Sequence, residues 1–418
     1  MQILRCFLGN SRSLVSCLAA TTLGLPAAAF AQPEATTPAA DLPPAVAPAP
    51  EPTLPPPPPI ASADPLQAKV EAQSKVGNLA KAQAATDKAL SSLTKLKFSG
   101  YVQGRYEFHQ DSKEALTDAG VGQASSQFLV RRARLKAVYT GTLAEYVLQI
   151  DATPGAVGLR DAEATLVEPW TPLGLKLTAG QFKWPFGFEV IQSSGVREMP
   201  ERTRVIRVLF PSERDRGVRL MGNWEKLRFA AAVVNGEGTS ANFAAADSSD
   251  HKDLVGRIGM DLDQLVFGVS GYVGENRVID KKAVAATDKA PAAAATFKDQ
   301  AKTRYGADLQ ARVAVPGVGD LTLRGEYILG EHGGKDVAGW YGFLMQDIAK
   351  KYGAFVRVDQ YDPDTAGDQV DDRTLAVGGG LHWLASGNFK LTVSYERPMA
   401  EKDDKDDDTV TVQAQATF

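Results

Sequence analysis

The stretch Phe98–His109 has the sequence FSGYVQGRYEFH and marks the point where the chain changes character. Before it glycine is scarce, whereas from it onward polar and apolar residues alternate with a period of two. Val102 and Phe108 share one parity, and Gln103 and Arg105 share the other. Because successive side chains of a strand point to opposite faces, this stretch predicts a strand with one apolar and one polar face.

The same alternation recurs to the end of the chain, for example in residues 144–151, 321–329, 389–396 and 409–418. Runs of about ten residues with one apolar face are typical of transmembrane barrels, which turn that face to lipid and the polar face to a watery lumen. A soluble sandwich, which would bury the apolar face against a second sheet, is the alternative. The pattern favours an all-β, antiparallel transmembrane barrel of about 16 strands.

The connections between these runs alternate in length. Short turns are predicted at residues 140–142, 225–226, 263–264 and 386–388. Long polar loops are predicted at residues 109–126, 239–251, 279–302, 362–373 and 401–408. This alternation is typical of outer-membrane barrels, which have short periplasmic turns and long extracellular loops.

The N-terminal residues 1–31 have the features of a secretory signal peptide. Arg5 and Arg12 are its positive region, residues 14–25 are its apolar core, and residues 29–31 form a small-residue cleavage site. We therefore expect an outer-membrane protein of a Gram-negative-type bacterium.

Residues 32–63 are rich in Pro and Ala and predict an extended linker. Residues 64–96 predict a periplasmic helix, the single helix of the protein, placed before Phe98. A weak coiled-coil face is formed by a heptad seam of Val76, Leu79, Leu90 and Leu93. The barrel domain is expected over residues 97–418, and residues 32–96 are candidates for periplasmic or cell-wall contact.

Composition excludes several classes of function. The net charge of −4 leaves no basic footprint for nucleic acid, and no apolar run reaches the ~18 residues of a spanning helix. The four histidines are scattered and lie in no metal or nucleophile motif. We predict no enzyme activity, no catalytic or metal-binding residues and no cofactor.

The region from Leu175 to Trp224 contains the long excursion Val190–Asp215 between two strand-like runs. Seven arginines and four acids lie between Arg197 and Arg219. A structureless loop of this length is usually functional. We expect the loop to fold into the barrel and narrow it, with Gly187 and Gly217 allowing sharp bends at its ends. The alternative is a solvated surface loop.

Three stretches resemble the phosphate-selective porin O and P family: FLVRRARL at 128–135, GQFKWPFG at 180–187, and Glu201-Arg202 followed by FPSERDRG at 210–217. The resemblance covers about residues 98–418. It implies a trimeric, sixteen-stranded outer-membrane channel. It also implies an Arg/Lys-lined path and a constriction made by the third extracellular loop.

Alternation and this resemblance together predict the residues of an anion path and its constriction. They are Arg132, Arg134, Lys136, Lys183, Arg202, Arg204, Arg207, Arg214, Arg216 and Arg219, with Asp151 as a partly pairing acid. Arginine matches oxyanions because its planar fork hydrogen-bonds their oxygens in pairs. Arg131 has the wrong parity for the lumen, so it is expected near the extracellular interface or at a bulge.

Acids on neighbouring strands leave an alternative open. Asp151, Asp161 and Glu163 could neutralise the arginines of residues 132–134. Other lumen arginines are expected to pair on their own strands: Arg257 with Asp261, Arg312 with Asp308, Arg324 with Glu326 and Arg357 with Asp359. Full neutralisation would give a general, non-selective porin.

The function predicted from the sequence is passive diffusion of small anions, phosphate or a related oxyanion, through a homotrimeric channel in outer-membrane lipid. A structural envelope protein tethered through its N-terminal linker and helix is the alternative from a different class.

Overall fold

The structure is a computed structural model, and it describes residues 65–110, 126–239, 250–281, 296–367, 373–400 and 408–418. The chain divides into two compact units, Met1–Glu71 and Ala72–Phe418, and every strand belongs to the second. The predicted signal peptide 1–31 and linker 32–63 lie outside the described residues. The first described element is helix α1, Pro65–Leu93, on which Val76, Leu79 and Leu90 are exposed.

Sixteen strands follow α1, which confirms the predicted fold class. Their bounds are β1 Leu96–His109, β2 Ser126–Thr140, β3 Ala144–Thr153, β4 Ala156–Val167, β5 Lys176–Lys183, β6 Arg214–Trp224, β7 Leu227–Val234, β8 Asp253–Asp261, β9 Leu265–Lys281, β10 Thr296–Val315, β11 Gly319–His332, β12 Lys335–Ile348, β13 Tyr352–Asp362, β14 Thr374–Ser386, β15 Phe389–Ala400 and β16 Thr409–Thr417.

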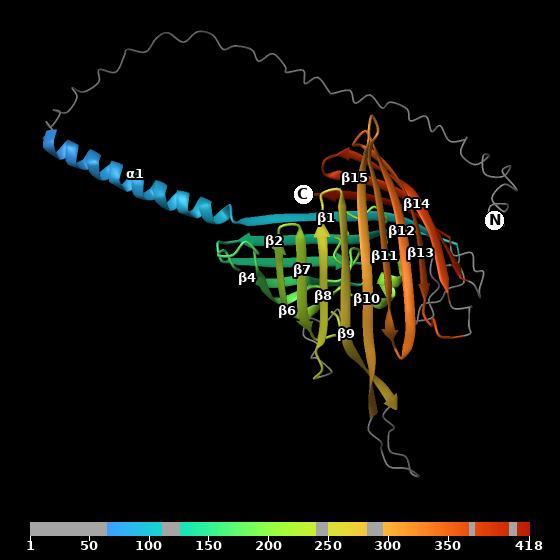
Figure 1. The fold of residues 1–418 in the computed structure, drawn as a ribbon. Coiled ribbons are helices and arrows are strands. Elements are labelled where there is room, and N and C mark those ends of the chain that lie inside the picture. The colour runs from blue at the N-terminus through green and yellow to red at the C-terminus, as the bar shows by residue number, and fades with distance from the viewer. Residues whose placement is uncertain (1–64, 111–125, 240–249, 282–295, 368–372, 401–407) are drawn as a thin grey trace, which may run out of the picture. The chain divides into compact units, whose positions relative to one another are not determined.

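The strands form one closed antiparallel sheet in which each strand pairs with its neighbours in the sequence. Figure 1 shows them side by side in chain order. The barrel closes where β1 pairs with β16 over Tyr101–His109 and Thr409–Thr417. Two further backbone bonds of 3.0 Å join Gly100 and the C-terminal Phe418. Closure leaves no unpaired strand edge.

The two faces of the sheet are the reverse of those in a soluble protein. On β2, Arg134 is 7% exposed, whereas the adjacent Leu135 is 44% exposed. Across the barrel the buried set is mainly polar, and large apolar side chains such as Leu220, Val269 and Leu381 are exposed. An apolar outer face is stable against lipid and a polar inner face against a hydrated lumen.

Aromatic side chains gather on the outside at the end of the barrel with the short turns. They are Phe98, Tyr146, Trp170, Trp224, Tyr352, Trp383, Phe389 and Phe418, all exposed. Such a girdle is typical of a membrane interface. Among the described residues, no helix is both long and apolar enough to cross a membrane.

Two details of the sequence prediction are wrong. The connection expected at 279–302 is shorter, because β9 continues to Lys281 and β10 begins at Thr296. A second helix, α2, forms at Arg204–Leu209 within the expected loop. The apolar triplet Val205, Ile206 and Leu209 lies on one side of α2 and is buried, so packing stabilises this short helix.

Candidate functional site: a loop across the lumen

Residues 184–213, which join β5 to β6, lie inside the barrel and are called here the inward loop. Its hydrogen bonds reach strands on both sides of the lumen. Ser194 Oγ contacts Tyr101 on β1 (2.6 Å) and Arg134 on β2 (3.0 Å). Glu198 accepts from Arg324 on β11 (3.1 Å), and the Glu201 carbonyl accepts from Arg357 on β13 (2.7 Å). The loop therefore crosses the lumen.

An apolar cluster within the lumen fixes the inward loop to the wall formed by β7–β13. Its loop members include Trp184, Phe186 and Phe210, which pack with Tyr272 of β9 and Ile328 of β11. Helix α2 contacts β12 and β13. Gly339 of β12 makes room for it, since an added Cβ would lie 2.6 Å from the Val205 side chain.

The two ends of the inward loop turn by positive backbone φ angles. Gly187 has φ +54°, and an added Cβ would lie 1.7 Å from Glu326 Oε1. At the other end the turn is at Glu213 (φ 61°), not at Gly217 as expected. Gly217 lies within β6, where a Cβ would lie 2.0 Å from the Val233 carbonyl oxygen, so its role is close strand packing.

Two β-bulges turn additional arginines into the lumen. The register of β1 and β2 skips Arg131, and the register of β3 and β4 skips Arg160. Arg131 donates to Glu201 of the inward loop (2.9 Å), and Arg160 donates to Asp151 (3.3 Å). A bulge re-aims a side chain against the alternation, which explains the parity of Arg131. Alternation alone gave no signal for Arg160.

The predicted residues of β2 are Arg132, Arg134 and Lys136, and their side chains point into the lumen. Arg132 is 3.8 Å from Glu201, and Arg134 forms a 2.6 Å ion pair with Asp151. Lys136 has neither a hydrogen bond nor an ion pair within 4.0 Å among the described residues. Its register partner on β3 is Gln149, whose buried Nε2 also lacks a partner in the described part of the chain.

Lys183 and Arg202 hold the inward loop together. The Lys183 ammonium donates to the carbonyls of Val190, Ile191 and Gln192 at 2.7–3.1 Å. Arg202 donates to the Gln192 carbonyl (2.8 Å) and to Glu213 (2.9 Å). These contacts occupy the Lys183 ammonium and one terminal nitrogen of Arg202, while Arg202 Nε and Nη1 have no partner among the described residues.

The other predicted arginines differ in their surroundings. Arg214 pairs with Asp161 (2.6 Å) and Arg219 with Glu163 (2.8 Å). On α2, Arg204 and Arg207 are exposed, and Arg207 is 3.9 Å from Glu396 of β15. Arg216 is half-buried on β6.

Two cavities adjoin the inward loop on different sides. The long-loop cavity, about 550 Å³, is lined by strand residues near the long connections and by loop residues 208–212. The short-turn cavity, about 370 Å³, is lined by strand residues toward the short turns and by loop residues 191–196. Asp151 lines the first and Arg134 the second, so their ion pair lies where the cavities adjoin.

The charge around the short-turn cavity is unbalanced. Its lining includes five basic residues (Arg134, Lys136, Lys183, Arg214 and Arg219) and two acidic ones (Asp161 and Glu163). Five of the eleven predicted path residues thus meet at one cavity. Arg132, Arg202, Arg204, Arg207 and Arg216 line neither cavity.

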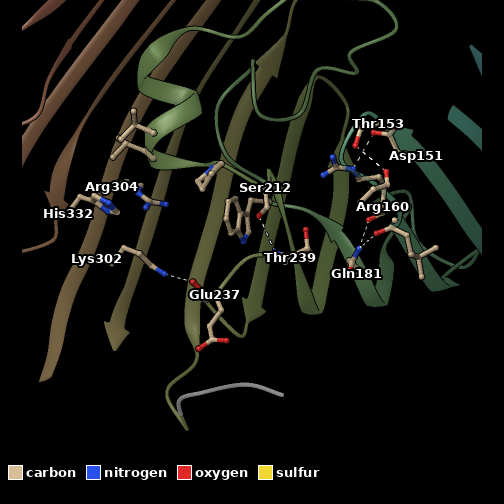
Figure 2. Close-up of a pocket in the computed structure, with 18 residues that line it drawn as sticks. Asp151, Thr153, Arg160, Gln181, Ser212, Glu237, Thr239, Lys302, Arg304 and His332 are labelled. Carbon is tan, nitrogen blue, oxygen red and sulfur yellow. Dashed lines mark hydrogen bonds and ion pairs between the residues drawn. The ribbon is translucent and has the colours of Figure 1, made fainter. Parts of the chain in front are cut away.

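The long-loop cavity contains basic residues that the sequence interpretation missed. Figure 2 shows Lys302, Arg304 and His332 on one side of it and Arg160 and Asp151 on the other. Lys302, Arg304 and His332 come from β10 and β11, about a hundred residues from the arginine-rich loop. The only sequence signal for Lys302 and Arg304 was that they lie two residues apart on β10 and so face the same side of the sheet.

Burial and neighbouring charges shift the pKa values of Arg197, Glu201 and Glu213 in the inward loop. Burial, reinforced by Arg202, lowers the pKa of Arg197 to about 10. Burial opposes ionisation of Glu213, but Arg202, Lys183 and Arg214 outweigh it and lower the pKa of Glu213 to about 2. Burial likewise opposes ionisation of Glu201, and the surrounding arginines hold its pKa below the usual range. Both carboxylates therefore stabilise the folded loop as anions.

Three of the expected arginine pairs differ in the structure. Arg257 pairs with Asp308 across the sheet (2.6 Å) rather than with Asp261. Arg324 pairs with Glu198 of the inward loop (3.1 Å) rather than with Glu326. Arg312 has no ion pair with Asp308 within 4.0 Å. In contrast, Arg357 does pair with Asp359 (3.0 Å). Arg324 and Arg357 both contact the inward loop, through Glu198 and the Glu201 carbonyl.

A closed sixteen-stranded antiparallel barrel with a loop folded into its lumen is a porin architecture. Residues 102–278 match the family described as phosphate-selective porin O and P, which confirms the resemblance indicated by the sequence motifs. A search of curated proteins found no match. Within the described residues, no group of three or more His, Cys, Asp or Glu side chains could hold a metal ion.

Solved structures similar to this chain include outer-membrane proteins. One is OmpT, an outer membrane protein of Vibrio cholerae in its trimer form (TM-score 0.53, 10% identity, 77% of this chain and 99% of that chain). Another is the outer membrane channel DcaP of Acinetobacter baumannii (TM-score 0.52, 12% identity, 77% and 97%). At this identity they establish the fold. Family and fold together indicate an outer-membrane channel rather than an enzyme.

Proposed function

We propose that this protein is an outer-membrane channel for the passive diffusion of small anions, with phosphate or a related oxyanion as its preferred substrate. The proposal rests on the charge around the short-turn cavity, which is lined by five basic residues and only two acidic ones. Arg/Lys-lined passages are how anion pores select their ions.

The groups that would receive an anion there are Lys136 and Gln149. They are register partners, both line the short-turn cavity, and both have donors free of protein partners among the described residues. A charge-assisted hydrogen bond contributes about 1.5–3 kcal/mol before desolvation. Conduction also requires that no single site bind too tightly, and a lone lysine with a neutral amide meets that requirement.

The alternative of a general porin has a specific observation in its favour. Arg134, Arg214 and Arg219 each have a carboxylate within 2.8 Å. In that case the net charge felt by a passing ion would be small.

Reversal potentials across a planar bilayer separate the two functions. In a potassium chloride gradient, the purified channel is expected to show a potential of the sign set by chloride, and added phosphate is expected to reduce the chloride current. A reversal potential near zero, without block by phosphate, would support the general porin.

The proposal also includes the oligomeric state of the channel and the roles of its N-terminal residues. The family resemblance and the trimer form of OmpT support a homotrimer. Residues 1–31 would be removed as a signal peptide, residues 32–63 would form a linker, and α1 would lie in the periplasm. There it would offer its exposed seam of Val76, Leu79 and Leu90 to neighbouring subunits or to the cell wall.

A further inference from the structure

Three residues that line the long-loop cavity carry buried nitrogen atoms that have no hydrogen-bond partner in the described part of the chain. These atoms are Arg304 Nε, Trp184 Nε1 and His332 Nδ1. Buried donors are almost always satisfied in proteins. Arg304 Nε and Trp184 Nε1 are donors, and His332 Nδ1 is a donor in one tautomer of the ring, so the residues around this cavity have capacity for a ligand that accepts hydrogen bonds.

Arg304 is the centre of this group. It is 2% exposed, and its guanidinium lies over the rings of Phe210 (4.5 Å) and Tyr272 (4.9 Å). Among the described residues it has no ion pair and no hydrogen bond. Aromatic rings hold the plane of a guanidinium and leave its edge available. A buried charge without an acid is costly, so an anion at this edge would lower the free energy.

The neighbours of Arg304 define which groups are available. Lys302 lies on the same face of β10, but its ammonium is bound to Asp253 (2.8 Å) and to the Gly236 carbonyl. His332 lies two residues after Gly330, the register partner of Arg304. Figure 2 shows Arg304 and His332 side by side at the cavity. Arg304 and His332 therefore form the free polar end of the site.

One part of the lining, on the inward loop, suits an apolar body. Trp184, Val208, Leu209 and Pro211 of the inward loop contribute to the cavity wall. The volume of about 550 Å³ is far larger than an inorganic oxyanion needs, and it falls within the roughly 300–1,000 Å³ of small-molecule sites.

We propose that the long-loop cavity binds a small organic carboxylate with an apolar body of about the size of benzoate. The carboxylate binds the Arg304 edge and His332, and the body packs against Trp184 and Val208. The site rests on the proposed channel function only in that the ligand reaches the lumen. It lies on the β10–β11 wall, apart from Lys136 and Gln149.

The test uses the full-length channel and two measurements with benzoate. Calorimetry in detergent measures binding, and block of chloride current in planar bilayers measures occupancy of the lumen. Benzoate is expected to bind and block at a lower concentration than acetate, because acetate lacks the apolar body. Arg304→Gln is expected to weaken benzoate roughly tenfold, as loss of one charge-assisted bond implies.

Two variants keep the test decisive. Trp184→Phe removes the indole N–H but keeps a ring, and it is expected to weaken benzoate binding by a few fold. This variant replaces Arg304→Gln in the test if Arg304→Gln fails to fold. Arg312→Gln changes an arginine on the same strand that lines neither cavity, and it should leave benzoate binding unchanged.

Three outcomes would overturn the site: benzoate no stronger than acetate, Arg304→Gln without effect on benzoate, or Arg304→Gln weakening phosphate block as much as benzoate block. The last outcome would make it a general oxyanion site. Benzoate binding without anion preference in reversal potentials would instead count against the proposed function and leave this site standing.

Discussion

Lys136 and Arg204 differ from the other basic residues of the predicted path. Among the described residues, their side chains have neither a hydrogen bond nor an ion pair within 4.0 Å, whereas Arg134, Arg214 and Arg219 each pair with an acid. A paired charge is largely cancelled for a passing ion. At the scale of single residues, selectivity should depend on the unpaired cations more than on the number of arginines.

Substitution of Lys136 by glutamine should therefore reduce anion preference. One charge at a hydrated site is worth on the order of 0.5–1 kcal/mol, so the chloride-to-potassium permeability ratio is expected to fall roughly two- to fivefold. Reversal potentials measure this ratio. Lys226→Gln, in an exposed short turn, is the matched control, and equal effects of the two variants would exclude Lys136 from the path.

The inward loop is the element on which the site depends. An apolar cluster, ion pairs to β1, β11 and β15, a hydrogen bond from β13, and two positive-φ turns all hold it across the lumen. Its arginines are used in two ways. Arg202 closes the loop onto itself, and Arg204 stands exposed on α2.

Gly187→Ala should release the start of the inward loop. Alanine at φ +54° costs about 1–2 kcal/mol, and its Cβ would displace Glu326, which accepts from the backbone N–H of Glu189 (3.2 Å). We expect a larger and noisier single-channel conductance. Gly342→Ala is the control, because an added Cβ there meets no atom within 4 Å. A normal conductance for Gly187→Ala would show that this turn does not hold the loop.

The inward loop should also detach in acid. The pKa of Glu213 falls from 4.5 to about 2 on folding. Its stabilising contribution is therefore complete above about pH 4.5 and is lost as the pH falls toward about 2. Single-channel conductance is expected to rise over this window. Glu201 acts in the same direction, so Glu213→Gln should reduce the rise without abolishing it. An identical transition in that variant would exclude Glu213 as a contributor.

On the scale of the whole molecule, the barrel has an apolar outer face and a polar lumen, and the family match over residues 102–278 together with the fold indicates an outer-membrane channel. Residues 72–418 contain every strand and both cavities. The channel should therefore not require the N-terminal segment.

The detergent-extracted protein is expected to be a trimer by light scattering. Deletion of residues 33–93, which ends before β1, should leave single-channel conductance unchanged, because no described residue of that segment lines either cavity. A monomer at micromolar concentration would contradict the trimer. Loss of a cellular role with conductance intact would identify the segment as a tether.

The sequence by itself determined the number of strands, the face that each turns to lipid and the position of the arginine-rich loop. These follow from a period of two residues and from connection lengths, which are local properties of the chain. The sequence also predicted eleven residues of one path, and the structure shows that five of them, Arg134, Lys136, Lys183, Arg214 and Arg219, line one cavity.

Only the tertiary structure decided which charges are cancelled. The bulge at Arg131 is one of two placements that the alternation allowed, whereas the bulge at Arg160 has no signal in the sequence. Arg324 pairs with Glu198, 126 positions away, because the loop docks on β11. The isolation of Arg304 between two rings likewise depends on that docking. An ion pair needs two side chains within a few ångströms, and register and loop packing set that distance.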